Sequence, residues 1–198
     1  MTTLTAADGT VLEARWDGPE DAGMAVVFCH PHPGYGGTMT APLMNGVTDG
    51  LTARGFAVLR FNFRGVGESG GHHDDGEGEV ADVAAAVAAA EARHPRVSVC
   101  GWSFGAAMAL RWMARSRRAL PFVGIAPPPQ LCPPPDQVPP GPKLIVVGDR
   151  EQVIDLDALR AYATAVGATV ETLVGSDHFF VFRHAQVAEV VAGFLSAE

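Results

Sequence analysis

Short apolar runs alternate along most of this chain with longer alanine-rich segments, and this alternation restricts the fold more than any other feature. Glycine or proline bounds each short run, as is typical of buried β-strands, whereas the longer segments have helical periodicity. Strands that alternate with helices form parallel sheets, because each helix carries the chain back to the starting edge. The predicted strands are 11–16, 25–29, 56–61, 97–100, 122–125, 144–147 and 170–174, and the predicted helices are 42–53, 79–93, 104–115, 156–166 and 181–195.

The first residues of the chain depart from this pattern. Asp8-Gly9 stands between two short extended runs, which indicates a hairpin. We therefore expect the sheet to begin antiparallel and to continue parallel. A chain of 198 residues is near the size of one domain, and we predict a single α/β domain over residues 1–198.

A proline-rich segment interrupts the alternation at residues 126–142, where nine of seventeen residues are proline. Proline lacks the backbone N–H and clashes with a preceding helical turn, so this segment cannot be helical. We expect an extended, polyproline-like surface loop. A domain boundary is the competing interpretation, but residues 143–198 continue the same alternation and would make a marginal second core.

Charge and cysteine content exclude several classes of protein. The chain has 14 Lys and Arg against 22 Asp and Glu, a formal net charge of −8, so it lacks a broad basic surface for nucleic acid or anionic lipid. No apolar run approaches the roughly 20 residues that span a bilayer, and residues 1–16 do not resemble a secretory signal. We expect a cytoplasmic protein. Three cysteines, an odd number, imply no disulfide framework.

A G-x-S-x-G motif at residues 101–105 follows the fourth predicted strand directly and precedes a helix. The chain must turn from strand to helix within about one residue, so we expect Ser103 at a strained backbone angle with its hydroxyl above the sheet. Side chains at Gly101 and Gly105 would collide with the neighbouring strand or helix. The N–H of Phe104 would point toward the same space as an oxyanion donor. The competing interpretation is a glycine-flanked helix cap.

A serine hydroxyl becomes a good nucleophile only when a base takes its proton and an acid orients that base. His178 stands just after the last predicted strand, and Asp149 and Glu151 stand just after the strand before it. Residues past the carboxyl ends of parallel strands gather at one edge of the sheet, so we expect Ser103, His178 and one carboxylate to meet there. Alternatively, His178 only packs against the two phenylalanines that follow it.

Together with two further loops, 28–39 and 60–69, these residues resemble the α/β-hydrolase superfamily over nearly the whole chain. The loops are similar to those of a small, lidless bacterial branch, like dienelactone hydrolases and serine aminopeptidases. The resemblance implies a mostly parallel twisted sheet of about seven or eight strands, with helices on both faces and no lid domain. It also implies that the arginine-glycine turn in the second loop is structural.

The resemblance implies hydrolysis of esters or related acyl compounds through an acyl-enzyme, with short acyl chains favoured and without a metal or organic cofactor. A thioesterase, a peptidase or amidase, and a catalytically weak scaffold that binds a partner through its proline-rich loop are the alternatives. The sequence does not identify a protein partner. Without a lid, the site should be an open, mildly apolar groove. Its expected walls are Tyr35, Phe104, Leu131, Phe179 and Phe180.

In the superfamily, the first loop supplies the second oxyanion N–H. Pro31 and Pro33 have no N–H, so His32 is the best match by position, with Gly34 and Tyr35 as rivals.

The acid of the superfamily is commonly an aspartate three residues after the glycine that ends the penultimate strand. Glu151 stands at that position here, and we predict that it is the acid. Its extra methylene moves the carboxylate, so Asp149 and Asp155 stay open as alternatives.

Two other patterns indicate different chemistry at first sight. Residues 65–70 spell G-x-G-x-x-G after a strand, but no helix opens there, as a dinucleotide site requires. His30 and His32, with residues 72–75 and 177–178, are spaced somewhat like metal ligands, yet metal amidohydrolase barrels need about 250 residues. We expect His30 to be a buried hydrogen-bonding residue and residues 72–79 to be a solvated loop.

Overall fold

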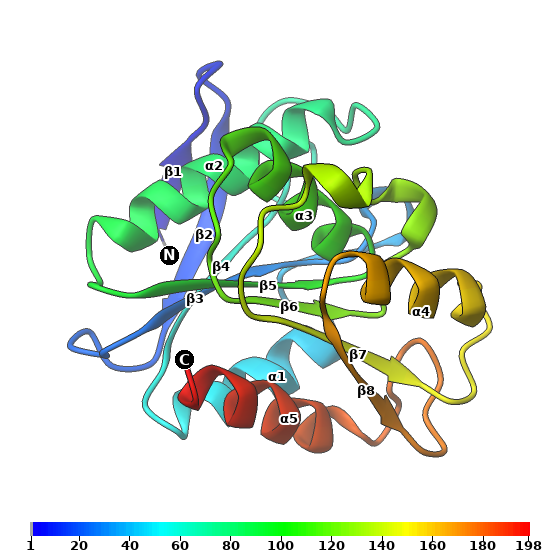
Figure 1. Ribbon diagram of the computed structural model, residues 1–198. Helices are drawn as coiled ribbons and strands as arrows, with labels where there is room; N and C mark the ends of the chain where they lie inside the picture. The colour runs from blue at the N-terminus through cyan, green and yellow to red at the C-terminus, as the bar shows by residue number, and fades with distance from the viewer. Residues whose placement is uncertain (1) are drawn as a thin grey trace.

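A computed structural model describes residues 2–198, which form one eight-stranded sheet with helices on both faces (Figure 1). The strands are β1 (Thr2–Thr5), β2 (Val11–Asp17), β3 (Ala25–Cys29), β4 (Ala57–Phe61), β5 (Val97–Trp102), β6 (Phe122–Ile125), β7 (Lys143–Gly148) and β8 (Thr169–Leu173). The helices are α1 (Pro42–Thr52), α2 (Glu77–Glu91), α3 (Phe104–Ser116), α4 (Leu156–Ala165) and α5 (His184–Ser196).

The strand order is β1-β2-β4-β3-β5-β6-β7-β8. β1 pairs with β2, and β2 with β4, in antiparallel fashion, while all pairs from β4 to β8 are parallel. This arrangement confirms the predicted sheet, which begins with a hairpin and continues with parallel strands. Because β3 to β8 are parallel, the loops that follow them lie at one edge of the sheet.

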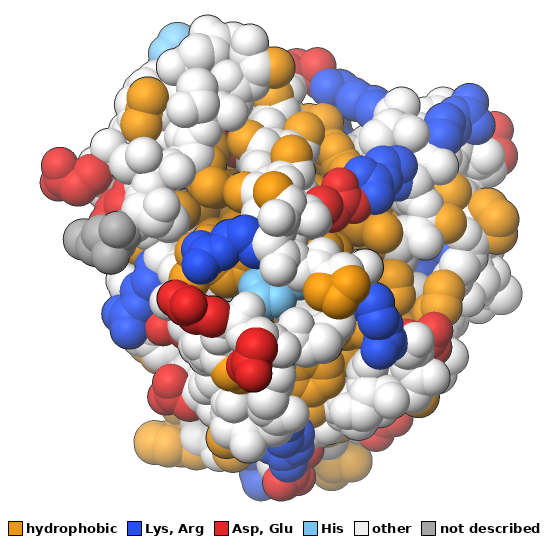
Figure 2. All heavy atoms as spheres, turned by 90° about the vertical axis from the view of Figure 1, so that its left-hand side faces the viewer, with side chains coloured by type: hydrophobic (Ala, Val, Ile, Leu, Met, Phe, Trp, Pro, Cys, Tyr) orange, Lys and Arg blue, Asp and Glu red, His pale blue; other side chains and the backbone are white. Residues whose placement is uncertain are grey.

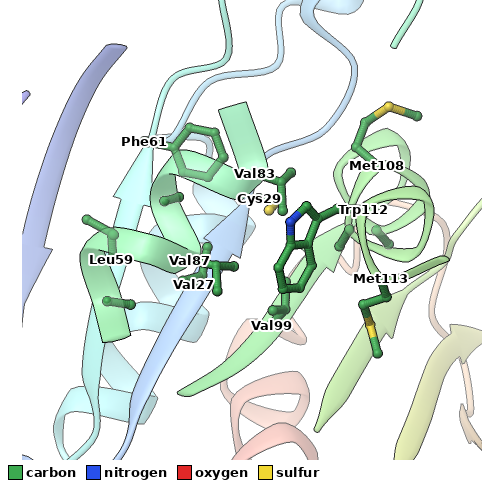
Figure 3. Close-up of a cluster of buried hydrophobic side chains, with 14 of the residues drawn as sticks. Val27, Cys29, Leu59, Phe61, Val83, Val87, Val99, Met108, Trp112 and Met113 are labelled. Carbon is green, nitrogen blue, oxygen red and sulfur yellow. The ribbon is translucent and has the colours of Figure 1, made fainter. Parts of the chain in front are cut away.

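The central strands are buried on both faces, and every residue of β3 and β4 is buried. α2 and α3 cover one face and α1 and α5 the other (Figure 1). Figure 3 shows the first of these layers, where side chains from the central strands meet those of α2 and α3. The labelled side chains are Val27, Cys29, Leu59, Phe61, Val83, Val87, Val99, Met108, Trp112 and Met113.

The last helix begins three residues later than predicted, at His184 instead of Val181. Phe180 and Phe182 have φ values of 52° and 61°, in the left-handed region that a right-handed helix excludes. Residues 174–183 therefore form a loop between β8 and α5, and this loop carries His178.

The proline-rich segment is less extended and less exposed than predicted. It contains two single turns of 3₁₀ helix, η2 (Pro129–Leu131) and η3 (Pro135–Gln137), each of which begins with proline. Proline is compatible with a first helical turn because the N–H that it lacks has no partner there. The Tyr162 hydroxyl donates a 3.0 Å hydrogen bond to the carbonyl of Pro133, so α4 holds the segment against the core.

The left-hand side of Figure 1, where β3 and β5 begin, carries acidic and basic side chains interspersed with apolar ones (Figure 2). None of the helices within residues 2–198 combines the length and the apolar character that a membrane crossing requires.

Candidate active site

Ser103 stands at the junction between β5 and α3 with φ 52° and ψ −118°. This backbone conformation is unfavourable for a residue with a side chain and costs about 1–3 kcal/mol. The Ser103 N–H donates to the carbonyl of Ile125 at 2.8 Å, and the Ser103 carbonyl accepts from Ala106 at 3.0 Å. These bonds to β6 and α3 hold the strained turn in place.

Gly101 and Gly105 leave no room for a side chain. A Cβ atom on Gly101 would lie 2.4 Å from the backbone nitrogen of Ala106. A Cβ atom on Gly105 would lie 2.4 Å from the carbonyl oxygens of Cys29 and His30. The expected collisions are thus confirmed: Gly101 faces helix α3, and Gly105 faces the end of strand β3.

His178 and Glu151 form a buried pair, with 2.8 Å between His178 Nδ1 and Glu151 Oε2. Their side chains are 6% and 0% exposed. The other carboxylate oxygen accepts hydrogen bonds from the N–H groups of Val153 at 2.7 Å and Ile154 at 3.3 Å. Burial by itself raises the pKa of the Glu151 carboxyl, but the hydrogen bonds from His178 and these N–H groups prevail and lower it below its usual value.

The two rival carboxylates are engaged elsewhere. Asp149 accepts a 2.6 Å hydrogen bond from the N–H of Gly175 and stabilises a turn. Asp155 is the N-cap of α4 and accepts from Asp157 and Ala158. Of the three carboxylates that the sequence offers, only Glu151 contacts His178.

Ser103 and His178 line one cavity of about 520 Å³ at the carboxyl edge of the sheet. Four of the five expected wall residues line it as well, but the prediction for Phe180 is wrong. That side chain is fully buried and packs in the core together with residues of α1 and α5. The wall residues that do line the cavity are Tyr35, Phe104, Leu131 and Phe179.

The Ser103 hydroxyl makes no hydrogen bond with any group of residues 2–198, although it shares the cavity with His178. Contacts between a nucleophile and its base are often long without substrate and tighten when substrate binds. The indole N–H of Trp102, the residue before Ser103, donates to the carbonyl of His178 at 3.2 Å. This hydrogen bond connects the loop that carries His178 to the end of β5, which precedes Ser103.

The loop after β3 leaves one N–H free beside the serine. The N–H of Gly34 donates to His32 Nδ1 at 3.0 Å, and the N–H of Tyr35 donates to the His32 carbonyl at 3.1 Å, so both rivals are occupied. Within residues 2–198, the N–H groups of His32 and Phe104 have no acceptor. Since both residues line the cavity, these two N–H groups are available to a developing oxyanion.

Comparisons with known proteins agree with this geometry. The profile of the family described as serine aminopeptidase S33 matches residues 21–140. The chain belongs to this family. It is therefore an α/β serine hydrolase, and the resemblance inferred from the motifs is confirmed.

Among relatives of this hydrolase is an uncharacterized protein of Rickettsia prowazekii, 30% identical over 189 residues, which are 88% of this chain and 79% of the relative. A lidless α/β serine hydrolase from Xanthomonas campestris superposes with a TM-score of 0.88 at 28% identity, over 99% of this chain and 93% of that chain. An α/β hydrolase of unknown function from Agrobacterium tumefaciens gives a TM-score of 0.86 at 29% identity, over 98% and 94%. The hydrolase thus has the lidless fold.

His30 is fully buried in this hydrolase, as expected, and both of its ring nitrogens are engaged. Nε2 accepts from the N–H of Phe63 at 2.9 Å, and Nδ1 donates to the carbonyl of Pro31 at 2.6 Å. Burial lowers the pKa of His30 to about 4, so the ring is neutral. Within residues 2–198, no three His, Cys, Asp or Glu side chains converge as metal ligands do.

A pair that the sequence pattern did not reveal, His73 and Glu79, lies beside the loop of His32. Residues 72–79 are not simply a solvated loop, because Glu79 is fully buried and its carboxylate lies 2.6 Å from His73 Nδ1. Its other oxygen accepts from the N–H of Gly76 at 2.9 Å at the start of α2. A glutamate at the third position of a helix is typical of a capping box, and this spacing is the signal that could have revealed it.

The His73 ring packs against two groups of the site. Its centroid lies 4.9 Å from the ring of His32 and 5.6 Å from that of Phe104. Burial, together with His73, lowers the pKa of His32, which favours a neutral ring. Glu79 thus holds His73 against both residues whose N–H groups are free.

Proposed function

We propose that this hydrolase cleaves carboxylic esters with short acyl chains through Ser103, His178 and Glu151. One observation carries the proposal: His178, which pairs with the buried Glu151 at 2.8 Å, lines the same cavity as a serine held at a strained strand-to-helix turn. A strained nucleophile and a base in one cavity, with a buried acid behind the base, are the parts that acyl transfer requires.

In the proposed reaction, His178 Nε2 accepts the proton of Ser103 as the serine oxygen attacks the ester carbonyl. The N–H groups of His32 and Phe104 hold the resulting oxyanion. His178 then gives its proton to the leaving alcohol, and an acyl ester remains on Ser103. Water, deprotonated by His178, releases the carboxylic acid and restores the serine. Glu151 stays ionised and stabilises the imidazolium in both halves.

The surroundings of Ser103 favour short acyl groups. The cavity has a volume of about 520 Å³, and apolar side chains such as Tyr35, Leu131 and Phe179 line much of it. Such walls bind apolar groups, but the lidless site offers no long enclosed channel that would bury an extended chain.

Hydrolysis of p-nitrophenyl acetate and longer p-nitrophenyl esters by the purified chain tests this function. Ser103→Ala should lower kcat by more than about 10³-fold, since the nucleophile is lost. Ser116→Ala, at the far end of the same helix, is the matched control and should keep full activity. Activity should survive EDTA and fall for chains longer than butyrate. Full activity of Ser103→Ala, a need for added Zn²⁺ or a preference for long chains would contradict the proposal.

A further inference from the structure

A second apolar groove, of about 340 Å³, lies beside the cavity of Ser103. It runs between the start of α1 and the loop that joins β8 to α5. Pro42, Trp102 and Phe179 line both hollows, so Trp102 and Phe179 form a shared wall between them. The residues that line the groove are Pro42, Leu43, Trp102, Phe179, Val181, Phe182 and His184.

The loop holds large apolar side chains in solvent at a cost in backbone strain. Phe182 is 98% exposed, and Phe179 and Val181 are about half exposed. Phe182 has a φ of 61°, a left-handed conformation that costs roughly 1–2 kcal/mol for a residue with a Cβ atom. Phe180, by contrast, is fully buried and anchors the loop. Exposed aromatic side chains on a strained, anchored loop do not stabilise the fold, so they point to a ligand.

The position of His178 indicates which part of a substrate would reach this groove. In the proposed mechanism, His178 protonates the leaving group, so that group must lie beside the imidazole. The Phe179 ring is 5.6 Å from the His178 ring, and the Trp102 ring is 6.2 Å from Phe179. Phe179 therefore provides an apolar surface close to the departing oxygen, and this surface leads into the groove.

We infer that this groove is the subsite for the leaving alcohol and that it takes an uncharged, ring-sized apolar group. The inference rests on the proposed function and assigns the substrate class: short-chain esters of bulky apolar alcohols. A cavity of about 150 Å³ already holds benzene, so 340 Å³ suffices for a ring. The lining has no carboxylate, lysine or arginine, so a charged alcohol would lose hydration while the groove offers a cation no partner and an anion only the imidazole of His184.

The test compares acetate esters that differ only in the alcohol, with acetate release followed by titration. Ethyl and cyclohexylmethyl acetate have leaving alcohols of similar basicity, and both give the same acetyl-enzyme. A leaving-group subsite therefore changes kcat/KM and not the breakdown of the acyl-enzyme. We expect kcat/KM for cyclohexylmethyl acetate to exceed that for ethyl acetate by at least about tenfold.

Phe182→Ser and, separately, Val181→Ser should lower this ratio at least about threefold, because each removes apolar contact area. The ratio of ethyl butyrate to ethyl acetate, which reports the acyl side, should change less than about twofold in the same variants. Val174→Ser is the matched control: Val174 is 79% exposed on the same loop but lies outside the groove, and its substitution should alter neither ratio.

Equal rates for the two acetates, or an alcohol ratio that neither variant changes, would overturn the inference while ester hydrolysis by Ser103 still stands. A change in both ratios together would show that the groove binds the acyl chain, which also overturns it. If the purified chain hydrolyses none of these esters and Ser103 is unreactive, the proposed function itself is wrong and the inference falls with it.

Discussion

In the proposed mechanism, Glu151 serves His178 in two ways. Its Oε2 accepts from His178 Nδ1 at 2.8 Å, which directs Nε2 away from the acid, and its charge stabilises the imidazolium that forms during the reaction. The longer glutamate side chain reaches the ring because the N–H groups of Val153 and Ile154 fix its other oxygen. The carboxylate is therefore both placed and kept ionised by its neighbours.

Substitutions of Glu151 and Asp149 test which of the two carboxylates acts as the acid. Glu151→Gln should lower kcat/KM for p-nitrophenyl acetate by about 10³–10⁴-fold, because an amide cannot stabilise the imidazolium. Asp149→Asn should cost less than about threefold, since an amide oxygen can still accept from the N–H of Gly175. Steady-state kinetics on both folded variants would check this, and the reverse ranking would assign the acid to Asp149.

The lowered pKa of Glu151 predicts how kcat/KM and the stability of the fold depend on pH. Its folded-state pKa lies below the ordinary value of 4.5, so the carboxylate stays charged at and above that pH. Protonation of Glu151 should therefore add nothing to the slope of log kcat/KM above about pH 5. The same shift stabilises the fold above pH 4.5, and this contribution is lost as the pH falls through the folded-state pKa. A slope above pH 5 that Glu151→Gln makes less steep would show that the Glu151 carboxyl titrates there, and this result would contradict the lowered pKa.

Residues placed by position after a strand could be predicted from the sequence, whereas residues placed by packing could not. Ser103, His178 and Glu151 each follow a predicted strand, and parallel topology alone brings such residues to one edge. His73 and Glu79 lie in a run of charges that looks solvated, yet Glu79 is fully buried and the His73 ring packs against His32.

The junction between β5 and α3 depends on close contact of backbone with backbone. Gly105 belongs to the first turn of α3, and its Cα faces the carbonyls of Cys29 and His30 at the end of β3. The same contact sets the distance between the serine and the loop that carries His32. The strand-to-helix turn and the loop of His32 are therefore one packed unit.

Gly105→Ala tests this unit. The added methyl must displace backbone atoms, and we expect a loss of about 1–3 kcal/mol in the free energy of unfolding. For a chain of this size, that loss lowers Tm by roughly 2–12 °C. Gly193→Ala in α5 is the matched control, because its Cβ would meet nothing within 4 Å. That variant should gain about 0.5–1 kcal/mol, since alanine favours the helix interior. Equal thermal shifts in the two variants would contradict the packing argument.

Apolar periodicity predicted nearly every helix and strand, but not the loops that shape the groove. Left-handed conformations at Phe180 and Phe182 delay the start of α5, and no pattern in an apolar run encodes them. Likewise, the proline content of residues 126–142 excluded an α-helix but did not reveal the hydrogen bond from Tyr162. Contacts between distant segments decide both cases.

A continuous sheet connects all parts of the proposed machinery. Ser103 follows β5, Glu151 follows β7 and His178 follows β8, and these strands belong to one ladder of parallel pairs. Displacement of any central strand would separate the serine from its base. The arrangement favours one cooperative unit, in line with the prediction of a single domain over residues 1–198.

Calorimetry would test whether the chain unfolds as one cooperative domain. We predict one unfolding transition, with a calorimetric enthalpy equal to the van't Hoff enthalpy, and loss of esterase activity at the same temperature. Two separate transitions, or cleavage within residues 126–142 that releases a folded fragment of residues 143–198, would instead support a domain boundary in the proline-rich segment.

Reaction with a fluorophosphonate probe tests the activation of Ser103 most directly, because only a serine with a working base and oxyanion donors reacts rapidly with it. Peptide mass spectrometry should locate one adduct on Ser103 in the native chain and no adduct in Ser103→Ala, with labelling strongly slowed in Glu151→Gln. A native, folded chain that stays unlabelled would contradict the account and favour a scaffold that binds a partner without catalysis.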